Sequence, residues 1–229
     1  GGSQLEFYTT PGPTAFLIFA MAQVNPGKYA GSIEQLEALL RAMQDRTGGI
    51  RDGDHKRDTV HTEPHVDGGT AMLVRANAAL AAAGGDAASW PAAAEQAWRW
   101  FKNNVLDPQA GVIYQGVGPE GRAPIHATDV YTWTMASPFG DRIAREYGLE
   151  TLKKLSLTVL HKSLVQVTWT TPDGTSRARL LFDFTDPTSS IVQRPMVEDS
   201  FHPDYGVTRG GYHPSGSTEW TAGAVLAFQ

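Results

Sequence analysis

The chain has 229 residues, of which 41% are hydrophobic, so it is long and apolar enough to bury a substantial core. Its net charge is −5, and its lysines and arginines are scattered, so nothing indicates the basic surface that a nucleic-acid partner requires. The absence of cysteine excludes disulfides, thiol nucleophiles and Cys-bound zinc.

The N-terminal region indicates neither a membrane span nor a retained export signal. The apolar run Phe16–Met21 is too short to cross a bilayer, and no basic segment precedes it. We interpret residues 1–12 as a leading linker and residues 13–229 as a single domain. We expect an extracellular or periplasmic protein whose signal was removed, cut at both ends from a larger parent chain.

Two helices are predicted in the first fifty residues. Pro11-Gly12-Pro13 is a strong breaker, and the apolar run that follows predicts a short buried helix over residues 15–24. Asn25-Pro26-Gly27 ends it. Ser32 and Gln35 have the spacing of a capping box, which predicts a second, amphipathic helix to about residue 46.

The rest of the chain alternates helical spacing with long polar loops. Apolar periodicity predicts further helices over residues 66–83, 89–105, 128–136 and 149–164, and a last one starting near Ser217. Leu164–Thr170 and Arg179–Phe184 flank a Pro-Asp-Gly turn and predict one β-hairpin. Loops as long as 185–216 are usually functional in compact domains.

The densest group of reactive side chains lies just before the predicted helix over residues 66–83. Pro64 suits a first helical turn, so Glu63 lies at the helix N-terminus and Asp67 about one turn further on. These carboxyl groups can face one cleft as catalytic residues, with His65 as a substrate-binding residue. The structural alternative is a helix cap, because acidic residues favour helix N-termini.

A second acidic residue opens the last predicted helix. Glu219 and Trp220 follow Ser215-Gly216-Ser217-Thr218, which ends a glycine-bearing loop as the segment before Glu63 does. Two such helix starts on one side of a helical barrel would bring two carboxyl groups together, with Trp220 in contact with substrate. Here too, capping of the helix is the structural alternative.

A third candidate segment begins at His126. Asp129 and Trp133 are four residues apart, so they share a helix face. A carboxylate beside an aromatic ring suits a sugar, which has hydroxyls at its rim and apolar C–H faces. We therefore assign His126, Asp129, Tyr131 and Trp133 to substrate binding.

Other catalytic chemistries have little support. His61 and His65 have the spacing of a zinc helix, but Thr62 stands where the metalloprotease motif requires glutamate, and Pro64 prevents one regular helix across both. We expect no metal and no cofactor. No Gly-x-Ser-x-Gly or Walker sequence is present. The spacing Gly116-x-Gly118-x-x-Gly121 is not preceded by a clear strand or followed by a helix.

The order of these features resembles the (α/α)6 toroid of the six-hairpin glycosidase superfamily. The resemblance lies in residues 14–22 as an inner helix and in the helix starts at Thr62–Asp67, Asp129–Trp133 and Ser217–Ala222. It implies a mainly α fold, an incomplete (α/α)6 toroid of helical hairpins with long loops and one short β-hairpin. It also implies a site where inner-helix N-termini and loops converge.

Members of that superfamily hydrolyse glycosidic bonds or cleave uronic-acid polysaccharides. The leading hypothesis is therefore a glycoside hydrolase acting on a poly- or oligosaccharide, with Glu63 as general acid and Asp67 or Glu219 as base. One alternative is a polysaccharide lyase that uses His126 or His65 with Tyr131. Another is a glycan-binding helical domain without catalysis.

Overall fold

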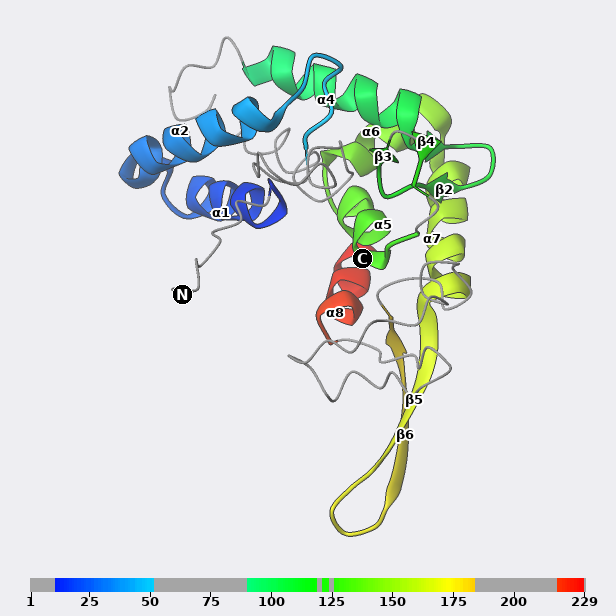
Figure 1. Ribbon diagram of the computed structural model, residues 1–229. Helices are drawn as coiled ribbons and strands as arrows, with labels where there is room; N and C mark the ends of the chain where they lie inside the picture. Colours follow the sequence, from blue (N-terminus) through cyan, green and yellow to red (C-terminus); the bar gives the residue numbers. More distant parts are fainter. Residues whose placement is uncertain (1–10, 52–89, 119–120, 124–125, 184–217, 229) are drawn as a thin grey trace, which may run out of the picture. The chain divides into compact units, whose positions relative to one another are not determined.

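A computed structural model describes residues 11–51, 90–118, 121–123, 126–183 and 218–228 (Figure 1). The chain divides into two compact units, which are described separately. The first comprises Gly1–Leu106, Gly116–Arg122 and Ser137–Phe139, and the second comprises Asp107–Gln115, Ala123–Ala136 and Gly140–Gln229. No helix among the described residues is long and apolar enough to cross a membrane.

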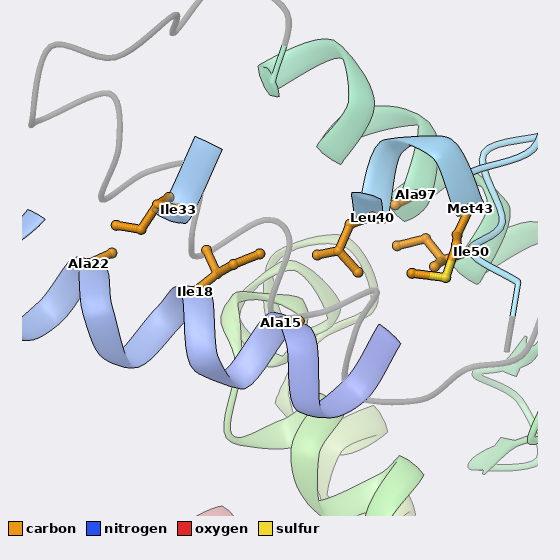
Figure 2. Packing of buried hydrophobic residues seen from close by; sticks show 8 residues of the cluster. All are labelled: Ala15, Ile18, Ala22, Ile33, Leu40, Met43, Ile50 and Ala97. Atoms are coloured by element: carbon orange, nitrogen blue, oxygen red, sulfur yellow. The ribbon is translucent and has the colours of Figure 1, made fainter. Parts of the chain in front are cut away.

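The first unit begins with a helical hairpin, α1 (Pro11–Val24) and α2 (Pro26–Met43). Figure 2 shows how aliphatic side chains of both helices meet in one cluster, to which later residues of the unit add. Its buried members are Ala15, Ile18, Ala22, Ile33, Leu40, Met43, Ile50 and Ala97. Removal of this apolar surface from water is the main force that holds the two helices together.

The predicted boundaries of this hairpin were partly wrong. The helix α1 begins at Pro11, because proline and glycine are tolerated in a first helical turn, so the expected breaker is the helix start. The helix α2 begins at Pro26, where Asn25 accepts a 3.0 Å hydrogen bond from the Lys28 amide. Ser32 therefore lies inside α2, and the capping box expected there does not form.

The helix α4 (Trp90–Asn104) carries the aromatic part of the same unit. The ring of Trp98 lies 5.7 Å from that of Phe101 and 5.1 Å from that of Phe139, centroid to centroid. The Gln44 side chain donates to the Gly48 carbonyl at 3.1 Å and to the Ala93 carbonyl at 2.8 Å. These two hydrogen bonds of Gln44 connect the turn after α2 to α4.

The second unit contains α5 (Thr128–Met135), α7 (Leu149–Ser163) and α8 (Thr218–Ala227). The strands β5 (Leu164–Thr170) and β6 (Ser176–Phe182) pair antiparallel in the order predicted from the sequence. The helix α7 continues directly into β5, and the hairpin returns the chain towards the end of α7 (Figure 1). In consequence, Asp183 donates its amide to the Ser163 carbonyl at 2.8 Å.

The remaining elements are short. The helix α6 (Pro138–Tyr147) was not predicted; it begins at Pro138, and proline is favoured at a first helical position. The sheet β1–β2 joins Leu106–Asp107 to Val112–Ile113, and the sheet β3–β4 joins Val117–Gly118 to Gly121–Arg122.

Gly48 is a position where only glycine fits. Its φ is 97°, and an added Cβ would lie 2.3 Å from the Gln96 carbonyl oxygen. We expect Gly48→Ala to lower the free energy of unfolding by on the order of 2 kcal/mol, from strain and the clash together. Urea denaturation measures the change. The matched control is Gly31→Ala, at an exposed position of α2 where an added Cβ meets no atom within 4 Å. It should stabilise the protein by about 0.5–1 kcal/mol.

Glu37 is a carboxyl group within the apolar face of α2. The residue is 1% exposed and lies between Ile33 and Leu40 along the helix. No hydrogen-bond donor among the described residues meets its Oε1. Desolvation, assisted by the charge of Glu34 and opposed by that of Arg41, raises the pKa of Glu37 to about 7. The group is therefore protonated in the folded protein at mildly acidic pH.

This burial predicts a particular pH dependence. The ordinary pKa of a glutamate is 4.5, so Glu37 loses its proton at lower pH in the unfolded chain than in the folded protein. The free energy of unfolding therefore falls as pH rises from about 4.5 to about 7. We expect Glu37→Gln to remove this loss, a gain on the order of 3 kcal/mol at pH 8. Thermal denaturation at pH 4.5 and pH 8 measures it. The control Glu150→Gln, at an exposed position, should keep the wild-type dependence of stability on pH. If Glu37→Gln also kept it, the assignment of Glu37 as a buried acid would be wrong.

Candidate active site

The candidate site in the second unit is built around the start of α5. The hydroxyl of Thr128, the first residue of α5, donates a 2.5 Å hydrogen bond to the Asp183 carbonyl. Both residues are fully buried. Ala127, the N-cap residue, has no side chain able to cap, so this tertiary contact fixes the helix start.

The helix α8 forms a hydrogen bond with Phe182, which precedes Asp183 and is the last residue of β6. The Thr221 hydroxyl accepts a 3.0 Å hydrogen bond from the Phe182 amide. The rings of Phe182 and Phe228 lie 6.1 Å apart and add an apolar contact between strand and helix. Phe182 and Asp183 therefore form hydrogen bonds with α8 and α5, two helices that are far apart in the sequence.

The helices α5 and α8 also contact each other directly. A Cβ added to Gly223 would lie 3.2 Å from Thr132 Oγ1 and 3.7 Å from Trp133 Nε1, so glycine permits a close approach here. Thr132 and Gly223 each lie further into their helices than the threonines bound to β6. Asp129 and Glu219 are each the second residue of their helix.

Asp129 is half-buried in the first turn of α5, and its Oδ1 accepts a 2.9 Å hydrogen bond from the Val130 amide. A carboxylate here interacts favourably with the positive end of the helix dipole. Trp133, one turn further on, is also half-buried. The shared helix face expected for these two residues follows from their positions in α5.

His126 and Tyr131 form a hydrogen-bonded pair beside this helix start. The Tyr131 hydroxyl accepts from the Ile113 amide at 3.0 Å and lies 3.2 Å from His126 Nδ1. Burial raises the pKa of Tyr131, which is 1% exposed, and the hydrogen bond from Ile113 only partly offsets this. Tyr131 therefore keeps its proton. The imidazole tautomer decides whether the hydroxyl donates to Nδ1 or accepts from it; where Nδ1 donates, the second ring nitrogen can accept a proton. The Tyr114 ring, 5.6 Å from the imidazole, forms a further neighbour.

The remaining predicted residues are described only in part. Glu63, His65 and Asp67 lie outside the described residues. Glu219 and Trp220 lie in the first turn of α8, where the backbone alone is described. Their catalytic and binding roles stay predictions. No cluster of three or more potential metal ligands occurs among the residues that the structure describes.

Sequence reasoning missed Asp183, which is fully buried and accepts a hydrogen bond from the first residue of α5. It also missed the two threonines that attach α5 and α8 to Asp183 and Phe182. The only available signal was the sequence Phe182-Asp183-Phe184, an acidic residue between aromatic residues after a predicted strand. Such a pattern marks a buried acid, but it does not identify the helices that the acid contacts.

The Tyr131 hydroxyl has a measurable structural role. We expect Tyr131→Phe to lower the free energy of unfolding by about 1–3 kcal/mol, because the buried Ile113 amide loses its acceptor. Chemical denaturation measures the loss. Tyr147→Phe, at a position 37% exposed, is the control and should change stability little. Equal stability of the two variants would contradict the hydrogen-bond assignment.

No protein-family model matches the sequence, and no curated protein matches it. The crystal structure of a D-mannose isomerase is similar in fold, with a TM-score of 0.52 and 14% sequence identity, over 66% of this chain and 40% of that chain. The structure of a cellobiose 2-epimerase from Bacillus thermoamylovorans B4167 has a TM-score of 0.49 and 14% identity, over 77% of this chain and 48% of that chain.

This chain thus spans less than half the length of either protein. At 14% identity the likeness to the isomerase concerns the fold alone. The expectation of a mainly helical, incomplete (α/α)6 toroid is confirmed. The described residues contain three short antiparallel strand pairs, where one β-hairpin was expected.

Proposed function

We propose that this chain is part of a saccharide-processing enzyme and that it cleaves glycosidic bonds by hydrolysis. The observation that supports this best is the attachment of α5 and α8 to two successive residues, Asp183 and Phe182, through threonines in their first turns. Each of these helices carries a carboxylic acid as its second residue. Glycoside hydrolysis requires two carboxyl groups that flank the scissile bond. In this proposal α8 contributes Glu219, a candidate for the base, and α5 contributes the substrate-binding Asp129.

The proposed reaction needs one protonated and one ionised carboxyl group. The acid donates its proton to the glycosidic oxygen as the bond to the anomeric carbon breaks, and the base takes a proton from the attacking water. The acid is Glu63, and the base is Asp67 or Glu219. Asp129 and Trp133 bind the sugar, through hydroxyl groups and the apolar ring face respectively. A carboxyl separation of about 6.5–9.5 Å gives inversion, and one of about 5–5.5 Å gives retention.

A second reaction is favoured by the His126–Tyr131 pair. A half-buried imidazole held by a protonated tyrosine suits proton transfer at a carbon beside a sugar carbonyl or carboxylate. His126 would take the proton, and the resulting enediolate or enolate would either be reprotonated, as in isomerisation, or lose its leaving group, as in a lyase. The similarity in fold to a D-mannose isomerase is compatible with the first outcome. Glycan binding without turnover is the remaining alternative.

Substitutions of the proposed acid and base test the hydrolytic reaction. We expect Glu63→Gln, and one of Asp67→Asn and Glu219→Gln, to reduce hydrolysis by at least roughly 100-fold, because each removes a group that transfers a proton. Release of reducing ends from a panel of poly- and oligosaccharides measures it. Glu150→Gln, on the exposed side of α7, is the matched control and should keep wild-type activity.

The products identify the reaction class. A lyase product absorbs in the ultraviolet through its new double bond, whereas an isomerase incorporates solvent deuterium at the carbon beside the carbonyl. For either of these reactions we expect His126→Ala to abolish turnover while Glu63→Gln retains it. If the full chain binds saccharides but none of the three products forms, the enzyme proposal is wrong.

A further inference from the structure

Two successive residues, Phe182 at the end of β6 and Asp183 after it, form main-chain hydrogen bonds with three helices. Phe182 donates its amide to Thr221 of α8, while Asp183 donates its amide to Ser163 at the end of α7 and accepts from Thr128 of α5. Phe182 is 6% exposed and Asp183 is 0% exposed. These bonds are therefore shielded from water, where hydrogen bonds hold geometry most firmly.

We propose that Phe182 and Asp183 form a positioning bridge that sets the relative place of the α5 and α8 N-terminal ends, and with it the spacing of Asp129 and Glu219. This inference rests on the proposed function. The bridge itself does not touch substrate. It acts through the first turns of the two helices, so Thr128, Thr221 and Asp183 are positioning residues.

The geometry of α5 supports a positioning role more than a stabilising one. Thr128 lies between His126 and Asp129 in the sequence, so any movement of its backbone moves both side chains. No side chain caps this helix at Ala127, and the first residue of the helix makes a tertiary hydrogen bond to Asp183. A displacement of about 1 Å from productive geometry can cost a reaction roughly 100-fold.

The decisive variants alter the hydroxyl of Thr128 alone. We expect Thr128→Val, which keeps the shape of the side chain, to lower kcat by roughly 10-fold to 100-fold with KM little changed. Thr128→Ser keeps the donor and should restore most of the loss. Thr221→Val removes the acceptor on α8 and should produce the same separation between kcat and KM.

A matched control exists in the same unit. The Thr158 hydroxyl donates a 2.8 Å hydrogen bond to the Gly111 carbonyl, away from the α5 start. Thr158→Val therefore removes a bond of the same kind, and we expect it to keep the wild-type kcat. If Thr128→Val behaves like Thr158→Val, or if Thr128→Ser fails to restore kcat, the bridge has no positioning role.

A second measurement needs no substrate. The ring signals of His126 in nuclear magnetic resonance spectra should shift in Thr128→Val and stay in place in Thr128→Ser and Thr158→Val. Unchanged signals in Thr128→Val would overturn the inference even in an active enzyme. Shifted signals in a protein that turns over no saccharide would support the bridge and reject the proposed function. The two claims thus fail separately.

Discussion

The second unit depends on a requirement that any buried backbone must meet: its amide and carbonyl groups need partners. At Phe182 and Asp183 those partners are two threonine hydroxyls and one carbonyl, supplied by α8, α5 and the end of α7. Unpaired, each such group would cost about 1–3 kcal/mol. The same requirement therefore stabilises the unit and attaches α5 and α8, each with an acidic second residue, to two successive residues of the chain.

Much of the secondary structure could be predicted because it follows from local periodicity. The strand Leu164–Thr170 and the helix α7 were predicted within one residue. The failures lay at prolines, since Pro11 and Pro138 occupy first helical turns and sequence alone does not distinguish a start from a break. The fold class was predicted from the order of helices and glycine-bearing loops. Errors of a few residues in the helix boundaries do not change that order.

The site was less accessible to sequence reasoning. His126, Asp129, Tyr131 and Trp133 are local to one helix, so their grouping could be predicted from spacing. The hydrogen bond from Ile113 to Tyr131 and the role of Asp183 depend on long-range contacts, for which a single sequence carries no signal. Glu63, His65 and Asp67 lie outside the described residues, so their place relative to Glu219 stays a prediction.

The pairing of Tyr131 with His126 limits which charges this side of α5 can present. Because burial holds the pKa of Tyr131 well above its ordinary value, the phenol does not ionise in neutral solution. An imidazole carries no negative charge in either of its protonation states, so neither member of the pair is an anion. A sugar acid approaching these two rings would meet no electrostatic repulsion from them at any physiological acidity.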